Sequence, residues 1–174
     1  MLEIDINWID SKYPGLLAVA KEFILGQEPM SPEPVIILKS EGIRVVVPFL
    51  ISSGERPMTT MVDLFAFDYL KSKLDMPERF AVVYQFANLM ENRRIFLKVY
   101  LDEDKPEVDS IHDLVRAANW FEREAWDLYG VVFRGHPNLV RILCHQDFEG
   151  HPLRKDYPAN QFQRLKSSTS SQGL

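Results

Sequence analysis

Two apolar segments joined by only three residues place the strongest limit on how this chain can fold. RFAVVYQFANL (79–89) and RRIFLKVYLD (93–102) flank Met90-Glu91-Asn92. Such closely spaced segments, rich in β-branched and aromatic residues, predict neighbouring strands of a mixed or antiparallel sheet. In the second segment every other position is apolar, as expected of a strand with one buried face: Ile95, Leu97, Val99 and Leu101.

The residues before this pair predict helices and two more strands. Apolar spacing over the first thirty residues predicts helix, interrupted at Pro14-Gly15. VIILK (35–39) and IRVVVPF (43–49) predict a β-hairpin, and Pro48 implies that its second strand ends there or lies at a sheet edge. In residues 59–74 the first half suits a strand and the second half a helix, and periodicity alone does not decide.

These elements predict an α+β fold with N-terminal helices, a sheet, one long helix and an extended, irregular C-terminal segment. We expect residues 1–110 to form the α+β domain, 111–158 the helix and an interface-forming segment, and 159–174 a disordered, low-complexity tail. Two further segments are expected to be connections: the stiff, proline-rich EPMSPEP (28–34) and the charged loop DEDKPEVD (102–109).

The long helix is predicted over about 111–129. Ser110-x-x-Asp113 matches a capping box at its start, and Gly130 supplies a stop at its end. At 100° per residue one apolar stripe follows the helix and predicts core packing: Ile111, Leu114, Val115, Ala118, Phe121, Ala125 and Leu128.

The opposite face of this helix carries Arg116, Trp120, Arg123 and Asp127. Arg123 and Asp127 are four residues apart and predict a solvated salt bridge. Trp120 has two interpretations: an anchor for another protein, or a side chain covered by the chain's own C-terminal segment.

Glu122 lies within the apolar stripe, where an unpaired carboxylate is unfavourable by several kcal/mol. We therefore expect a cation beside it, with Arg141, Arg154 and Lys155 as candidates that would clamp the irregular segment onto the helix. A general acid with a raised pKa is the alternative interpretation of Glu122.

Composition excludes several classes of function. The net charge of −5 disfavours nucleic acid as a partner, and no GxGxxG or GxxxxGK[ST] nucleotide motif occurs. A single cysteine, Cys144, excludes an internal disulfide and a self-contained iron–sulfur cluster. The acidic start, MLEIDINWID, lacks the basic region of a signal peptide, so we expect a cytosolic protein or one held at a membrane's cytosolic face by a partner.

Four residues invite a metal-site hypothesis: His136, Cys144, His145 and His151. None of the usual ligand spacings is present, and the adjacent Cys144 and His145 would point in opposite directions in an extended chain. The two Gly-His-Pro units are better interpreted as turns, in which each histidine hydrogen-bonds to nearby backbone or to a carboxylate.

Taken together, NWFEREAWDLYGVVFRGHPNLVRILCHQDFEGHPLRKDYP strongly resembles the signature of the 30 kDa subunit, also called the C subunit, of NADH:quinone oxidoreductase, respiratory complex I. The family pattern is A-x-W-x-E-R-E-x-x-D-x-x-G-I-x-F-x-G-H-P-x-L-x-R-I-L, followed by G-x-P-L-R-K-D-x-P. Upstream, MVDLFAFDY resembles the family's L-x-D-x-x-A-x-D-Y, which implies a strand at 59–67. Family members also carry a helix between the strands matching 43–49 and 59–67, for which ISSGERPM is too short.

The resemblance implies a non-catalytic scaffold in the peripheral arm of a proton-translocating complex at the cytoplasmic face of the cell membrane. This chain would bind no cofactor, whereas FMN and iron–sulfur clusters would lie in partner subunits. Its expected neighbours are the quinone-pocket subunit of the D type and the iron–sulfur subunit of the B type. The residues implied in the interface or its structural support are Trp120, Glu122, Arg123, Glu124, Asp127, His136, Arg141, His151, Arg154, Lys155 and Asp156.

Three alternatives stay open at the level of sequence. The first is the equivalent subunit of an energy-converting membrane-bound hydrogenase or related oxidoreductase, because related subunits occur there. The second is a free-standing metal-dependent hydrolase that uses His136, His145, His151 and a carboxylate. The third is a soluble adaptor unrelated to respiration.

Overall fold

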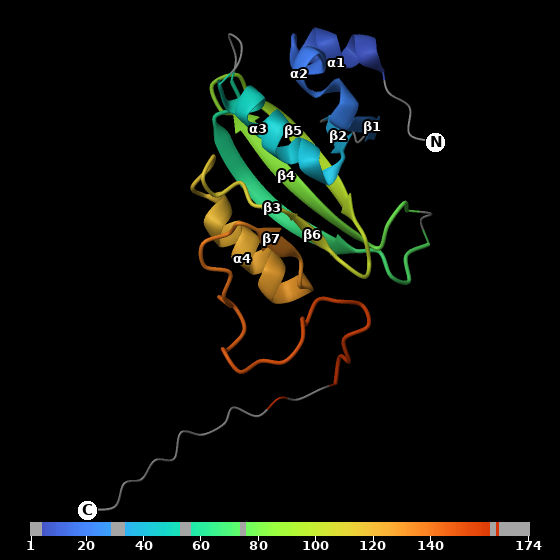
Figure 1. Cartoon of the computed structure of the whole chain (residues 1–174), viewed down its shortest axis with the longest axis vertical. Helices are drawn as coiled ribbons and strands as arrows, with labels where there is room; N and C mark the ends of the chain where they lie inside the picture. Colours follow the sequence, from blue (N-terminus) through green and yellow to red (C-terminus); the bar gives the residue numbers. More distant parts are fainter. Residues whose placement is uncertain (1–4, 29–33, 53–56, 74–75, 161–162, 164–174) are drawn as a thin grey trace, which may run out of the picture.

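The predicted α+β fold is confirmed in the computed structural model, which describes residues 5–28, 34–52, 57–73, 76–160 and 163 (Figure 1). The main sheet has the strand order β1-β2-β5-β4-β3, and a second, two-stranded sheet pairs β6 with β7. The strands are β1 (Ile24–Glu28), β2 (Val35–Leu38), β3 (Thr60–Asp68), β4 (Phe80–Asn88), β5 (Arg93–Leu101), β6 (Glu107–Asp109) and β7 (Val132–Arg134). The helices are α1 (Ile6–Lys12), α2 (Leu16–Ala20), α3 (Ile43–Ser52) and α4 (Ala118–Tyr129), with short 3-10 turns η1 (Lys21–Phe23) and η2 (Ser40–Gly42).

The β4–β5 pair forms the predicted antiparallel hairpin. Its register runs without a bulge from Phe80 opposite Leu101 to Asn88 opposite Arg93. β3 pairs antiparallel with β4, whereas β2 pairs parallel with β5, so the sheet is mixed. Residues 60–68 therefore form the strand that the resemblance implied.

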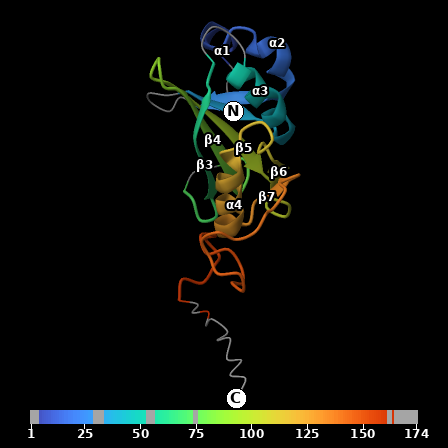
Figure 2. The ribbon, with the colours of Figure 1, turned by 90° about the vertical axis from the view of Figure 1, so that its left-hand side faces the viewer.

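One face of the sheet and the buried sides of all four helices form a single core cluster. On β4 this face carries Phe80, Val82, Tyr84 and Phe86, all fully buried. Helices α1, α2 and α3 gather at one end of the molecule, and α4 lies toward the other end (Figures 1 and 2). None of the helices in the described residues is both long and apolar enough to cross a bilayer.

The opposite face of the sheet has an apolar groove of about 390 Å³. Within this groove the Lys98 ammonium lies 2.9 Å from Oε1 of Glu28, and the Tyr100 hydroxyl donates to the same oxygen. Lys98 is only 5% exposed, so this pair satisfies a charge that would otherwise be buried alone. The groove is lined by Glu28, Val35, Phe65, Phe67, Tyr69, Met76, Val83, Phe96 and Lys98.

The predicted second strand at 43–49 is wrong, because these residues form α3. The four side chains that α3 buries are spaced as on one face of a helix: Ile43, Val46, Val47 and Leu50. Pro48 lies inside this helix. β2 pairs with β1 and β5, and not with residues 43–49 as predicted. α3 thus takes the place of the strand that the resemblance matched to 43–49.

Three smaller predictions also need correction. Residues 24–28 form a strand that pairs with β2, so the N-terminal helical region ends at Phe23. The described residues after β3, 69–73, form turns instead of a helix, and the charged loop ends in strand β6. The predicted joint at 28–34 and the predicted disordered tail at 159–174 lie largely outside the described residues.

The long helix begins at Ala118 and not at residue 111. Residues 112–117 form turns, and the supposed capping box has other contacts. The Ser110 hydroxyl bonds to Glu122, and Asp113 forms a two-pronged pair with Arg44. The predicted stop is confirmed: Gly130 has a φ of 76°, and its N–H donates to the Trp126 carbonyl.

Candidate functional site

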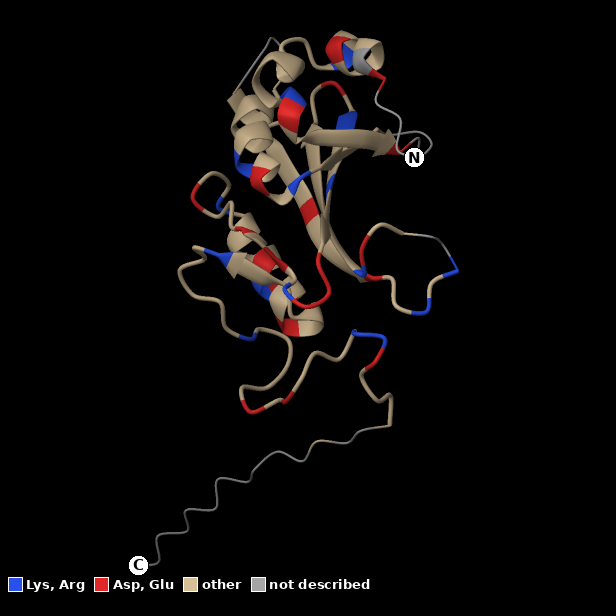
Figure 3. Ribbon diagram, turned by 45° about the vertical axis from the view of Figure 1, so that its right-hand side comes forward, with Lys and Arg blue, Asp and Glu red and all other residues tan. Residues whose placement is uncertain are grey.

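The signature residues lie on α4, on β7 and in residues 135–160, which are called the C-terminal segment from here on. Apart from turns, this segment has no regular secondary structure. Its Lys and Arg residues are interspersed with Asp and Glu along a winding path (Figure 3). Because a backbone without regular structure needs other hydrogen-bond partners, the side chains of α4 decide its shape.

Asp127 is the centre of this organisation. One carboxylate oxygen, Oδ2, accepts from the backbone N–H groups of Ile142, Leu143 and Cys144 at 3.0, 2.8 and 2.9 Å. The other, Oδ1, lies 2.6 Å from a guanidinium nitrogen of Arg141. Burial raises the pKa of this carboxyl, but the hydrogen bonds from Cys144 and Arg141 outweigh that effect and lower it to about 2.

The predicted solvated pair between Arg123 and Asp127 is therefore wrong. Asp127 is 0% exposed because the C-terminal segment covers it. Arg123 instead donates to the carbonyls of Val140 and Arg141, at 3.1 and 3.3 Å. Both side chains fix the backbone of the same segment, but through different atoms.

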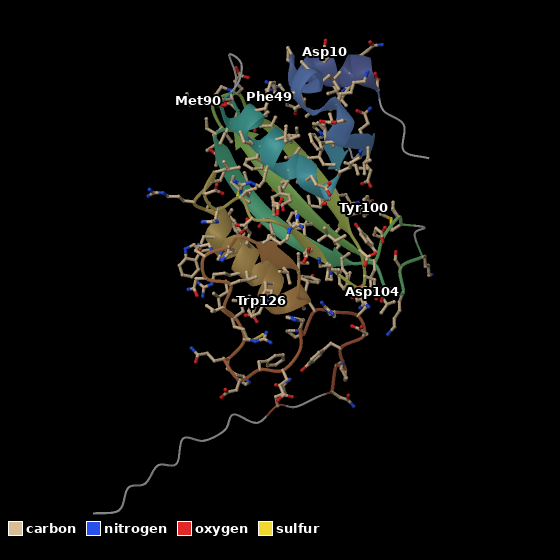
Figure 4. The ribbon with its side chains drawn as sticks, in the orientation of Figure 1. Asp10, Phe49, Met90, Tyr100, Asp104 and Trp126 are labelled. Carbon is tan, nitrogen blue, oxygen red and sulfur yellow. The ribbon has the colours of Figure 1, made fainter. Side chains whose placement is uncertain are left out.

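Arg141 joins three parts of this site. Besides Asp127, it donates to the Gly150 carbonyl at 2.8 Å. Its guanidinium stacks 5.5 Å from the Trp126 ring and 5.4 Å from the Phe148 ring. Trp126 projects from α4 beside the C-terminal segment, where its ring and the His151 ring meet edge to face at an angle of 71° (Figure 4).

Glu122 is fully buried, as its position on the apolar stripe predicted, but the predicted cation is absent among its described partners. Its carboxylate accepts from the Ser110 hydroxyl at 2.5 Å and the Ile111 N–H at 2.8 Å. Burial raises the pKa of Glu122 to about 7, against the effect of these two hydrogen bonds. The cation candidates Arg141, Arg154 and Lys155 have other contacts.

Both histidines of the Gly-His-Pro units bond to carbonyls of α4. Nε2 of His136 donates to the Asn119 carbonyl, and its Nδ1 accepts from the Asn138 N–H, both at 3.1 Å. Nδ1 of His151 donates to the Asp127 carbonyl at 3.0 Å. Burial lowers the pKa of each ring. The interpretation as turns is confirmed, and within the described residues no three His, Cys, Asp or Glu side chains are grouped as metal ligands would be.

The LRKD sequence attaches the end of the segment to the sheet. Nε of Arg154 donates to the Tyr129 carbonyl at 2.6 Å, and the Lys155 N–H donates to Asp68 at 2.8 Å. Asp156 lies 2.9 Å from a guanidinium nitrogen of Arg79, and Arg79 also forms an ion pair with the buried Asp68. Gly130 permits this approach, because a Cβ there would lie 2.5 Å from Arg154 and His151.

Sequence reasoning misses Ser110, Asp68 and Arg79. The sequence could have indicated Asp68, since it lies in MVDLFAFDY, which resembles a family stretch, but nothing in that stretch indicates the partners of Asp68. Ser110 resembles a helix cap, and its true partner, Glu122, lies twelve residues later on a helix with a different start.

Two signature residues, Trp120 and Glu124, point to solvent, and Trp120 is 62% exposed. The C-terminal segment therefore does not cover Trp120, which leaves the anchor interpretation.

Comparison with known proteins matches residues 36–163 to the family described as the 30 Kd subunit of respiratory-chain NADH dehydrogenase. The chain belongs to this family. The match covers β2 through the C-terminal segment, and so includes both the sheet and the contacts around Asp127.

Curated relatives agree. The C subunit of NADH-quinone oxidoreductase from Cereibacter sphaeroides is 39% identical over 143 residues, or 82% of this chain and 69% of that protein. NADH-quinone oxidoreductase subunit 5 of Thermus thermophilus is 47% identical over 103 residues, or 56% of this chain and 50% of that protein. The chain thus spans between half and roughly two thirds of the length of these relatives.

Solved structures share the fold. A trypsin-resistant fragment of Nqo5 superposes with a TM-score of 0.60 at 28% identity, covering 75% of this chain and 98% of the fragment. A chain of an archaeal membrane-bound sulfane sulfur reductase superposes with a TM-score of 0.65, covering 92% of this chain and 94% of that chain. At 20% identity, the second likeness concerns the fold alone.

Proposed function

We propose that this chain is a non-catalytic structural subunit of the peripheral arm of a proton-translocating NADH:quinone oxidoreductase. It docks on the quinone-pocket subunit of the D type and adjoins the iron–sulfur subunit of the B type. FMN and the iron–sulfur clusters reside in partner subunits, and the chain is held at the cytoplasmic face of the cell membrane through the complex.

The observation that carries this proposal is how the signature residues are used. Asp127, Arg141 and His151 bond to main chain and fix the path of the C-terminal segment. The segment thereby presents apolar side chains to solvent, with Leu143 61% and Leu153 44% exposed. Irregular backbone held rigidly, with exposed apolar residues, suits a surface that other subunits cover. The names of the family and of its relatives supply the complex.

Affinity purification of the tagged chain from detergent-solubilised membranes tests this proposal. Mass spectrometry and an NADH:quinone assay should find it in a large complex with flavin- and iron–sulfur-bearing subunits. Arg141→Ala should lower activity only in proportion to the complex lost, because Arg141 acts on assembly. A fully assembled complex with no turnover would instead place chemistry at Arg141, and a lone soluble chain would refute the proposal.

A second candidate is the corresponding subunit of another membrane-bound respiratory complex, such as an energy-converting hydrogenase. The fold is compatible with this candidate, because a chain of a sulfane sulfur reductase complex has the same fold. The same purification separates the two, because hydrogenase-type partners would keep the scaffold role and change the electron donor.

A further inference from the structure

The outer side of α4 is divided into a covered half and an open half. Over the C-terminal half, the segment buries Asp127 completely. Over the N-terminal half Trp120 is largely open to solvent, and Arg116, in the turn just before the helix, is also exposed. Trp120 is 62% exposed, so a large apolar ring lies in water, which is unusual for a surface that no other protein covers.

Exposed apolar side chains of the C-terminal segment continue this open half. Val140 is 44% exposed, and its carbonyl accepts from the Nε of Arg123 at 3.1 Å. Arg123 in turn lies over the Trp120 ring, with its guanidinium carbon 4.9 Å from the ring centroid. Trp120, Arg123 and Val140 are therefore contiguous; together with Arg116, which is exposed in the turn that leads into α4, they are called the Trp120 patch.

The charge of the patch indicates what can cover it. Neither Arg116 nor Arg123 forms an ion pair with a carboxylate in the described part of the chain. Arg123 donates only to carbonyl groups, which leave its charge uncompensated. Glu124 is exposed nearby, so the two arginines leave the local charge positive. An exposed tryptophan with an arginine over its ring has the composition that interface cores favour.

We propose that the Trp120 patch docks into an apolar pocket with an acidic rim on a neighbouring subunit of the complex. This inference rests on the proposed function and adds the chemistry of the partner surface. Trp120 fills the pocket, Val140 extends the apolar contact, and Arg116 meets carboxylates at the rim. Arg123 holds both apolar side chains in one arrangement through its stacking and its carbonyl contacts.

The test uses the full tagged chain, expressed in cells that assemble the complex. Trp120→Ala should weaken association with the identified respiratory subunits about 30-fold or more, as loss of a central anchor does. Arg116→Glu should slow association and reduce its dependence on salt, since rim charges act on encounter. A photo-crosslinker in place of Trp120 should label one subunit, at an apolar site beside Asp or Glu.

Met90→Ala is the matched control, because Met90 is 96% exposed and lies at the β4–β5 turn, far from α4 (Figure 4). Circular dichroism of each variant should match that of the unaltered chain, since none of the three side chains is buried. If Trp120→Ala associates as well as Met90→Ala while the unaltered chain still recovers the complex, the proposal for the Trp120 patch is refuted and the proposed function stands. If the unaltered chain recovers no respiratory subunits, the proposed function fails as well.

Discussion

Replacing Asp127 with Asn should release the C-terminal segment from α4. The carboxylate accepts three backbone N–H groups on one oxygen and the Arg141 guanidinium on the other. An amide has only one acceptor oxygen, so its NH2 group must face either the guanidinium or the three N–H groups. In both orientations donors oppose donors in a fully buried position.

The expected loss follows from these contacts. Hydrogen bonds to a charged group each contribute about 1.5–3 kcal/mol, and removing one partner of a buried ion pair costs about 3–5 kcal/mol. We expect Asp127→Asn to lower the free energy of unfolding by about 3–5 kcal/mol, out of a typical total of about 5–15 kcal/mol. Urea denaturation measures this loss, and hydrogen exchange should show the amides of residues 142–144 losing protection.

Asp113→Asn is the control for Asp127→Asn. Asp113 also forms a two-pronged pair, with Arg44, but their side chains are 46% and 38% exposed. Exposed pairs contribute about 1 kcal/mol or less. Equal losses in the two variants, or retained protection at residues 142–144 in Asp127→Asn, would refute the reasoning that burial and backbone contacts make Asp127 dominant.

Three further outcomes are expected. The pKa of Glu122 is about 7 in the folded chain, above its ordinary value of 4.5, so protonated Glu122 stabilises the fold and this stabilisation is lost as pH rises between the two values. Relative to Glu122→Gln, the free energy of unfolding of the unaltered chain should fall by about 3 kcal/mol from pH 4 to 8, as measured by urea denaturation at each pH. Gly130→Ala should lower the melting temperature more than Gly135→Ala, because both have positive φ but only Gly130 has neighbours within 4 Å, and equal shifts would contradict the crowding argument. Arg79→Met should cost about 3–5 kcal/mol by leaving the Asp68 carboxylate buried and unpaired, and adding Asp68→Asn should recover part of that loss in a double-mutant cycle.

The sheet is predictable where its signals are local. The β4–β5 hairpin needs only two apolar segments and a short turn, and Gly130 acts through its own backbone conformation. α3 escapes prediction because its run of valines favours a strand locally. The helical spacing of Ile43, Val46 and Leu50 is also present, but only packing against the sheet decides between the two.

In the candidate site too, features that depend on one helix are predictable and features that depend on distant segments are not. Burial of Glu122 follows from its angle on α4, which depends on that helix alone. Its partners do not follow, because Ser110 and Ile111 precede turns where the sequence predicts a longer helix. The angle of Asp127 predicts a solvated residue, and this prediction is wrong because the covering segment lies about fifteen residues further along the chain.

The hydrogen bonds around Asp127 depend on a side chain at one end and on main chain at the other. The carboxylate binds the main chain of residues 142–144, so these three hydrogen bonds do not themselves require a particular side chain at any of the three positions. Proline cannot replace any of them without losing one hydrogen bond, because it has no N–H to donate. Asp127 thus sets the backbone of this turn, and through the backbone it sets the direction in which the side chains at these positions point.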